Sequence, residues 1–168
     1  MKIILNPSNL LKFETNESYE DDHISCVLDD VCEKIDENKL AVFQVCFEEY
    51  DKIFEFSDFK YDFTSIFYEL KDLFEFIDNR KKGQFELSFF ELNRSVFFYI
   101  DDDEFLFLKV KDSNENKFVV TSDRITLQKI KSVILQIMHQ FRLILISKFP
   151  KAYEIIHSND YFVLLSNN

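Results

Sequence analysis

Apolar residues recur at every third or fourth position over Phe63–Ile77, with polar residues between them. This spacing places the apolar side chains on one face of a helix and predicts about four helical turns. Asp62 is a suitable N-cap for this helix, and Gly83 follows the basic residues at 80–82, where a helix commonly ends. The segment therefore predicts an amphipathic helix that lies against a hydrophobic core.

A second helix is predicted from near Thr126 to Pro150, because proline cannot continue a helix. Its most apolar part, Val133–Ile146, still contains four polar or charged residues, Gln136, His139, Gln140 and Arg142. No stretch approaches the roughly 20 apolar residues that a membrane span needs. We therefore expect a core helix and no membrane as a partner.

Between these helices, short apolar runs alternate with polar breaks, which is typical of antiparallel strands joined by hairpins. The run Phe105–Val110 is apolar at nearly every position, so we expect this strand to be buried on both faces. The predicted strands are Gln84–Leu92, Ser95–Ile100, Glu104–Lys111 and Lys117–Thr121.

The flanking segments are less regular. Short β-like runs occur at Lys2–Leu5, Ser18–Leu28, Leu40–Phe47 and Ile53–Phe56, and a tail at Tyr153–Ile156 and Tyr161–Leu165 is expected to add a turn or an edge strand. No repeat or linker divides the chain, so residues 1–168 are predicted to form one domain. The predicted fold class is α+β, with an antiparallel β-meander sheet packed against two long amphipathic helices.

Composition excludes several kinds of functional site. The chain has 168 residues, a net charge of −11 and a single glycine, Gly83. One glycine cannot build a dinucleotide fingerprint, a phosphate-binding P-loop or a nucleophile elbow. The charge is uneven: residues 1–62 carry a net −10, whereas residues 125–168 carry +3. This acidic half disfavours direct binding of nucleic acid and favours a basic partner.

The compartment follows from the cysteines and the N-terminus. Met1–Leu5 has only a three-residue apolar run before Asn6 and Pro7, which is too short for a secretory signal. With three cysteines and no export signal, we expect reduced, buried thiols and a cytoplasmic location.

Candidate metal sites are weak in this sequence. His23, Cys26, Cys32 and Cys46 lack the tight Cys-x₂₋₄-Cys hook of a structural zinc site. The acidic run 101–104 lacks the alternate spacing and the central glycine of a calcium loop, and it is typical of a solvated hairpin tip. The three histidines show no local Ser or Cys partner, so we expect no catalytic residue, no metal and no cofactor.

One resemblance rests on the order and spacing of several segments. The strand Leu40–Phe47 leads to the helix Phe63–Ile77, then to FELSFFEL (Phe85–Leu92), SVFFYI (Ser95–Ile100) and FLFLKV (Phe105–Val110), and FVVTSDRITLQKI (Phe118–Ile130) opens the last helix. This order resembles small acidic immunity proteins of bacterial polymorphic-toxin and contact-dependent growth inhibition systems. The short turn Asp123–Leu127 before the final helix is similar to theirs, whereas Asn93–Ser95 stands where those families commonly carry a glycine.

The resemblance implies an antitoxin function, in which the chain binds a cognate toxin domain, such as a basic nuclease, and neutralises it stoichiometrically. The acidic clusters are the expected contact residues: Glu20, Asp21, Asp22, Asp29, Asp30 and Glu33 in the first, and Asp101, Asp102 and Asp103 in the second. The alternatives are a non-catalytic adaptor or structural subunit of a phage or secretion assembly, which would use an apolar edge strand, and an acid-dependent metallohydrolase. Self-association is left open.

Overall fold

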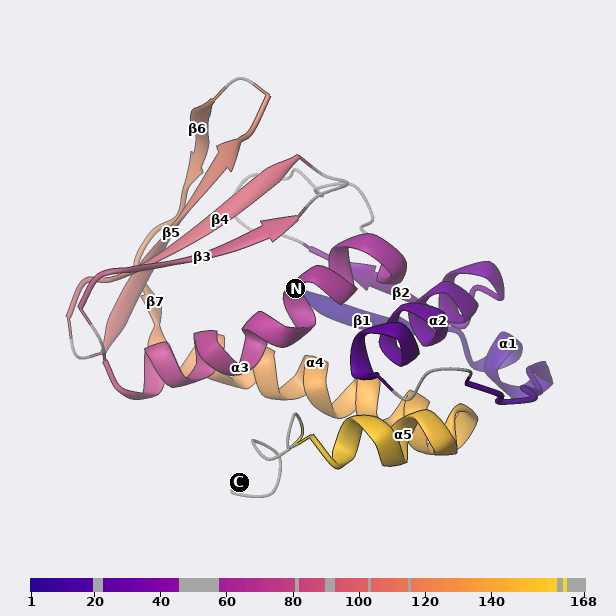
Figure 1. Ribbon diagram of the computed structural model, residues 1–168. Coiled ribbons are helices and arrows are strands. Elements are labelled where there is room, and N and C mark those ends of the chain that lie inside the picture. The colour runs from indigo at the N-terminus through magenta and orange to yellow at the C-terminus, as the bar shows by residue number, and fades with distance from the viewer. Residues whose placement is uncertain are drawn as a thin grey trace.

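The computed structural model describes residues 1–19, 23–45, 58–80, 82–89, 93–102, 104–114, 116–159 and 162. These residues form a mixed α and β fold, in agreement with the predicted class (Figure 1). The strands are β1 (Lys2–Leu5), β2 (Ala41–Gln44), β3 (Gln84–Phe89), β4 (Arg94–Ile100), β5 (Phe105–Asp112), β6 (Lys117–Thr121) and β7 (Ile125–Thr126). The helices are α1 (Pro7–Lys12), α2 (Ile24–Glu37), the π-helical turn η2 (Phe59–Phe63), α3 (Thr64–Asp78), α4 (Leu127–Lys148) and α5 (Pro150–His157).

The predicted meander is confirmed. Strands β3, β4, β5 and β6 pair antiparallel in chain order, and β7 pairs with the first residues of β5. Along β5 the residues alternate between half-buried and buried, so the prediction that Phe105–Val110 is buried on both faces was wrong. One face of β5 is in the core, and the other remains partly open to solvent.

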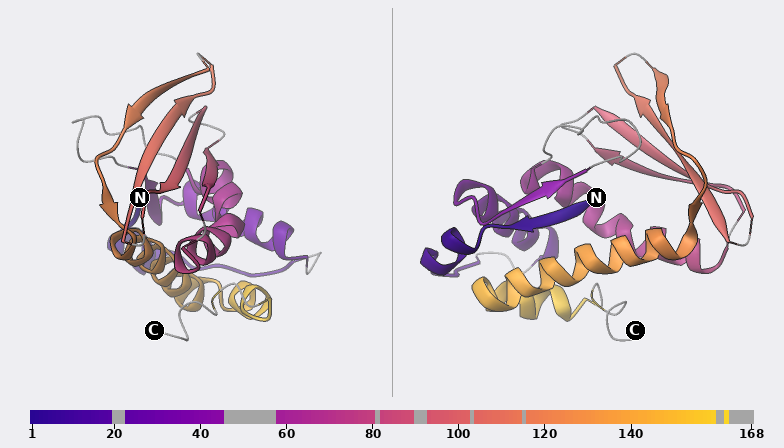
Figure 2. Two further views of the ribbon diagram at one scale, coloured as in Figure 1. Left: turned by 90° about the vertical axis from the view of Figure 1, so that its left-hand side faces the viewer. Right: turned by 180° about the vertical axis from the view of Figure 1, so that it is seen from behind.

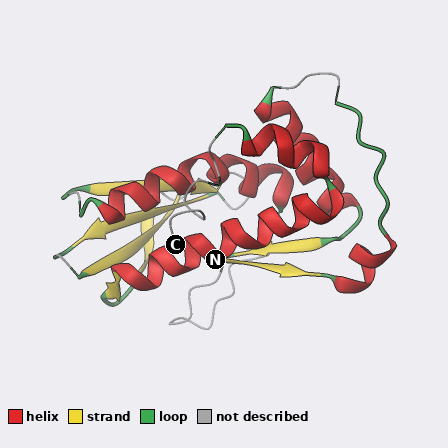
Figure 3. Ribbon diagram, turned by 90° about the horizontal axis from the view of Figure 1, so that it is seen from below, coloured by secondary structure: helices red, strands yellow, loops and turns green. Residues whose placement is uncertain are grey.

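The two predicted helices cover one face of this sheet. Seen from below, α3 and α4 lie side by side against the strands (Figure 3), and the other views show the opposite face of the sheet turned away from them (Figure 2). A cluster of phenylalanines joins η2, α3 and α4. Its centre is Phe141 of α4, whose ring centroid lies 4.8 Å from that of Phe63 and 5.4 Å from that of Phe67.

The helix α4 begins and ends where the sequence predicted. Thr126 accepts a hydrogen bond from the Lys129 amide at 3.2 Å, and the helix ends at Lys148, just before Pro150. By length and composition, α4 could also cross a membrane. A helix packed within the core of a fold meets the same criterion, and in this fold one side of α4 is buried against α3 and β1.

The described part of the segment Ser18–Leu28 contains no strand. From Ile24 it forms α2, whose inner face is completely buried at Val27, Leu28 and Val31, and whose outer face is acidic. The strand β2 is shorter than predicted, ends within Leu40–Phe47, and pairs with β1 to form a separate two-stranded ribbon. The predicted strand Ile53–Phe56 lies outside the described residues.

The start and end of α3 differ from the sequence prediction. Asp62 is buried within η2, the turn that leads directly into α3. Asp58 caps η2, because its carboxylate accepts hydrogen bonds from the amides of Tyr61 and Asp62 at 2.8 and 3.3 Å. At the other end, Arg80 adopts the left-handed conformation (φ 48°) just after α3. Gly83 (φ 138°) serves instead as the turn into β3, a conformation that favours glycine.

The expected turn or edge strand at Tyr153–Ile156 is the helix α5. Pro150 is the first residue of this helix, a position where its missing N–H costs nothing. The buried Glu17 carboxylate satisfies the next amides, those of Lys151 and Ala152, at 3.2 and 3.0 Å. In the predicted segment Tyr161–Leu165, only Phe162 is described, and it is buried in the core.

Candidate functional site

The acidic face of α2 contains half of the first predicted cluster. Asp29 is exposed, and Asp30 and Glu33 are partly exposed one and four positions further along the same helix. The buried inner face fixes this helix, so these carboxylates are presented by a rigid element. Glu20, Asp21 and Asp22, the remaining residues of this cluster, lie outside the described residues.

Two lysines partly neutralise this face. The Asp30 carboxylate pairs with Lys34 one helical turn away at 2.6 Å, and Glu33 pairs with Lys60 of η2. The Lys60 ammonium is also 5.4 Å from the centre of the Tyr61 ring. In α2 the five acids, Asp29, Asp30, Glu33, Asp36 and Glu37, face only one lysine, so the surface remains negative after Lys60 is included.

Asp36 has a structural role at the edge of this face. Its carboxylate accepts hydrogen bonds from the backbone amides of Phe59 and Lys60 at 3.0 and 2.9 Å, which ties α2 to η2. Burial raises the pKa of Asp36, against the opposing effect of these two hydrogen bonds. Desolvation also raises the pKa of Asp29, with Lys60 opposing this effect and Glu33 adding to it.

The second predicted cluster lies at the tip of the hairpin that joins β4 and β5, where Arg124 forms ion pairs with it. Arg124 pairs with Asp101 through Nε at 2.9 Å and with Asp102 through Nη2. The Asp102 carboxylate also accepts hydrogen bonds from the amides of Glu104 and Phe105, each at 2.9 Å, and these bonds lower its pKa. Asp103 lies outside the described residues. Arg124, from the loop between β6 and β7, therefore neutralises part of the negative charge at the tip.

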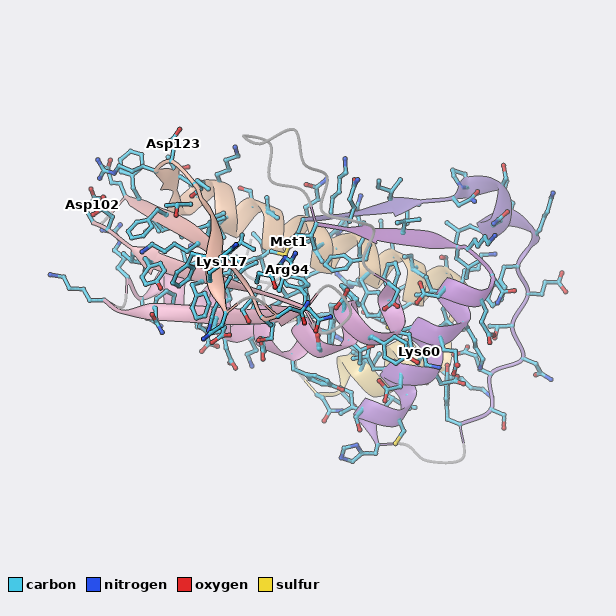
Figure 4. The ribbon with its side chains drawn as sticks, turned by 90° about the horizontal axis from the view of Figure 1, so that it is seen from above. Met1, Lys60, Arg94, Asp102, Lys117 and Asp123 are labelled. Atoms are coloured by element: carbon cyan, nitrogen blue, oxygen red, sulfur yellow. The ribbon has the colours of Figure 1, made fainter. Side chains whose placement is uncertain are left out.

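The structure does not bring the two acidic clusters together. In the view from above, Asp102 lies at one end of the molecule and Lys60, which marks the α2 face, lies towards the other (Figure 4). Of the two, the α2 face is the larger and the less neutralised.

The zinc alternative gains no support from the part of the chain that is described. Cys26 is exposed, contrary to the expectation of buried thiols, whereas Cys32 is fully buried and burial raises its thiol pKa. Cys46 lies outside the described residues. Among those residues, no group of three or more His, Cys, Asp and Glu side chains is placed to hold a metal ion.

The sequence analysis missed an aromatic face on the five-stranded sheet. Tyr99 and Phe107 lie directly opposite each other on β4 and β5, and their rings stack with centroids 5.0 Å apart. Phe97 and Phe118 extend this group, and Lys109 lies among the rings. Along β4 and β5 these side chains alternate with core residues, so the period-2 pattern could have placed the aromatic residues of each strand on one side. The strand register is what unites them in a single face.

Mild acid is expected to stabilise the fold. The carboxyl groups of Asp29, Asp36 and Glu69 have pKa values raised chiefly by burial, above the ordinary values of 3.8 for Asp and 4.5 for Glu. The folded state then holds more protons than the unfolded chain as pH falls, so the free energy of unfolding rises from neutrality towards the ordinary carboxyl range and levels off below it. Urea denaturation at about pH 7.5 and about pH 5.5 measures this change.

The variant Glu69→Gln isolates one contribution to this pH dependence. One carboxylate oxygen of Glu69 is buried and has no hydrogen-bond partner among the described residues. The charges of Glu86 and Asp72 disfavour ionisation of Glu69 further. We expect the variant to be more stable than the parent at the higher pH and to show a flatter pH profile. A parent protein that loses stability over the same interval would contradict this assignment.

Comparisons with protein-family models, with curated proteins and with solved structures found no match to the chain.

Proposed function

We propose that this chain is an antitoxin: an immunity protein that binds a cognate, basic toxin domain and neutralises it by stoichiometric protein–protein inhibition. The observation that carries the proposal is the acidic face of α2, where Asp29, Asp30 and Glu33 are held on a helix whose other side is buried. A rigid acidic helix complements a surface built to hold phosphates, such as that of a nuclease. The order of elements that resembles immunity proteins supports the same function.

Electrostatics favours rapid capture of such a partner. The net charge of −11 attracts a basic domain over a distance of about one Debye length, roughly 8 Å at physiological salt. At contact, the α2 carboxylates replace the anions that a nuclease site holds. A cytoplasmic location would place the antitoxin where an incoming nuclease acts.

The experiment starts with the tagged protein in its native lysate, and mass spectrometry identifies what co-purifies. The captured toxin domain is then purified, and its activity is titrated with the antitoxin. We expect activity to reach zero at one equivalent and the complex to run as a single 1:1 species. A captured protein whose activity is unchanged by excess antitoxin would overturn the proposal.

The two-stranded ribbon favours a second candidate function, that of an adaptor. Ile4 of β1 and Val42 of β2 face each other across this ribbon and are 41% and 37% exposed. Neither strand pairs on its outer edge with any other strand in the described part of the chain. Such an edge could add a strand from another subunit. Concentration-dependent self-assembly of the purified protein, without loss of monomer stability, would favour this function over the antitoxin.

A further inference from the structure

The outward face of the five-stranded sheet forms a second surface whose chemistry differs from that of α2. Its residues fall in cross-strand rows: Tyr99 lies opposite Phe107, and Phe97 lies opposite Lys109. A register shift in β6 places Phe118 opposite Lys111. Phe97, Tyr99, Phe107 and Phe118 therefore lie on the same side of the sheet, and none of them belongs to the hydrophobic core that α3 and α4 complete.

The exposure of this face is uneven. Phe97 is nearly buried (8% exposed) beneath its neighbours, whereas Phe118 is 50% exposed, and Tyr99 and Phe107 lie between these extremes. No described helix covers these rings, because α3 and α4 lie against the other side of the sheet (Figures 1 and 2). Large aromatic side chains grouped at a surface are typical of contact residues in protein interfaces.

Lys109 gives this face its charge. Its Nζ lies 5.2 Å from the ring centre of Tyr99, 5.7 Å from that of Phe107 and 5.4 Å from that of Phe118. Within the described residues, this ammonium contacts rings and forms no ion pair with a carboxylate. Lys111 lies two residues further along the same face. A chain of net charge −11 thus holds cations on its aromatic face while its acids lie mainly elsewhere.

We propose that this face binds a protein segment that presents a carboxylate beside an aromatic or large apolar side chain. The carboxylate would pair with Lys109, whose ammonium the rings hold in place, and the apolar side chain would lie on the stacked pair Tyr99 and Phe107. A charge-assisted hydrogen bond that replaces water at a partly desolvated lysine is stronger than one between neutral groups. This proposal does not depend on the antitoxin function.

A single-stranded nucleic acid is the other class of partner that stacks on aromatic faces. Such a strand carries about one negative phosphate per nucleotide, and it binds by stacking several successive bases on aromatic side chains. The face offers Lys109 and Lys111, and Glu86 lies in the same row as Phe97 and Lys109. One carboxylate in an apolar segment matches these few cations, whereas a row of phosphates does not.

The test uses a defined probe, the peptide acetyl-Gly-Phe-Asp-Phe-Gly-amide, with a second peptide in which Asn replaces Asp. Both are titrated into the isotopically labelled full chain, and backbone amide shifts locate binding. We expect shifts in β4, β5 and β6, and about tenfold weaker binding of the Asn peptide, which corresponds to one lost charge-assisted bond. Binding of both peptides with equal affinity, or of neither, would overturn the proposal.

Variants test whether the charge of Lys109 is needed for binding while the fold is kept. Lys109→Met keeps an unbranched side chain on the rings and removes the ammonium, so we expect it to weaken binding of the Asp peptide about tenfold and leave the Asn peptide unaffected. Lys12→Met, an exposed lysine of α1, is the matched control and should change neither affinity. Shifts that appear on simple dilution would assign the face to a second copy of this chain. Preferential binding of an oligothymidylate would assign it to nucleic acid, and either result would refute the proposal.

Discussion

Replacing Phe141 by alanine is expected to lower the free energy of unfolding by about 3–5 kcal/mol. Phe141 is fully buried in α4, and its ring centroid lies 4.8 Å from that of Phe63, 5.4 Å from that of Phe67 and 6.4 Å from that of Phe59. These three residues belong to η2 and α3, so the truncation opens a cavity where the three elements meet. A whole domain is stable by only about 5–15 kcal/mol, so the loss is a large share of the total.

Chemical denaturation of the parent and the variant measures this loss directly, and the slope against denaturant shows whether both unfold in the same way. Phe118→Ala is the matched control, because it removes the same atoms from a ring that is half exposed on the sheet. We expect this control to cost less than about 1 kcal/mol. Equal losses in the two variants would mean that the phenylalanine cluster does not organise the core.

The regular, locally encoded elements could be predicted from sequence. The meander from Gln84 to Thr121 follows from alternation and short polar breaks. The helix α4 follows from helical spacing of its apolar residues and from the stop at Pro150, and both signals act over a few residues. The helix α2 was missed although Val27, Leu28 and Val31 have helical spacing, because His23 at its N-cap forms no capping hydrogen bond and a short apolar run was interpreted as a strand. For α5, Pro150 was interpreted only as a stop.

The rest depends on contacts between distant residues. Glu17 caps α5 by accepting a hydrogen bond from an amide 134 residues away in sequence, and Asp36 anchors η2 by accepting one from an amide 23 residues away. No local sequence pattern predicts either hydrogen bond. At the candidate sites, the sequence showed where acidic residues cluster. It did not show which of their carboxylates form ion pairs with lysine or arginine in the fold. Arg124 neutralises the hairpin tip from another loop, and Lys60 pairs with Glu33 of α2. The aromatic face needed the strand register, which alternation alone does not provide.

If α2 is the contact surface of the antitoxin, reversing two of its charges should weaken toxin binding about a hundredfold, a loss of roughly 2.7 kcal/mol. The variant is Asp29→Lys combined with Glu33→Lys, one turn apart on the exposed side of the helix. It places two lysines against a basic surface and removes the Glu33 carboxylate that pairs with Lys60. The lost ion pair between Lys60 and Glu33 is partly exposed to solvent, so its loss should have little effect on the stability of the fold.

A matched double reversal separates local contact from overall charge. Asp72→Lys combined with Glu75→Lys makes the same change in net charge on the exposed side of α3. Because both doubles reduce long-range attraction alike, both should slow association at low salt, but only the α2 variant should speed dissociation. Surface plasmon resonance at two salt concentrations resolves these rates. Equal affinity losses in the two doubles would reduce the role of α2 to long-range steering, and unchanged affinity in both would exclude α2 from the interface.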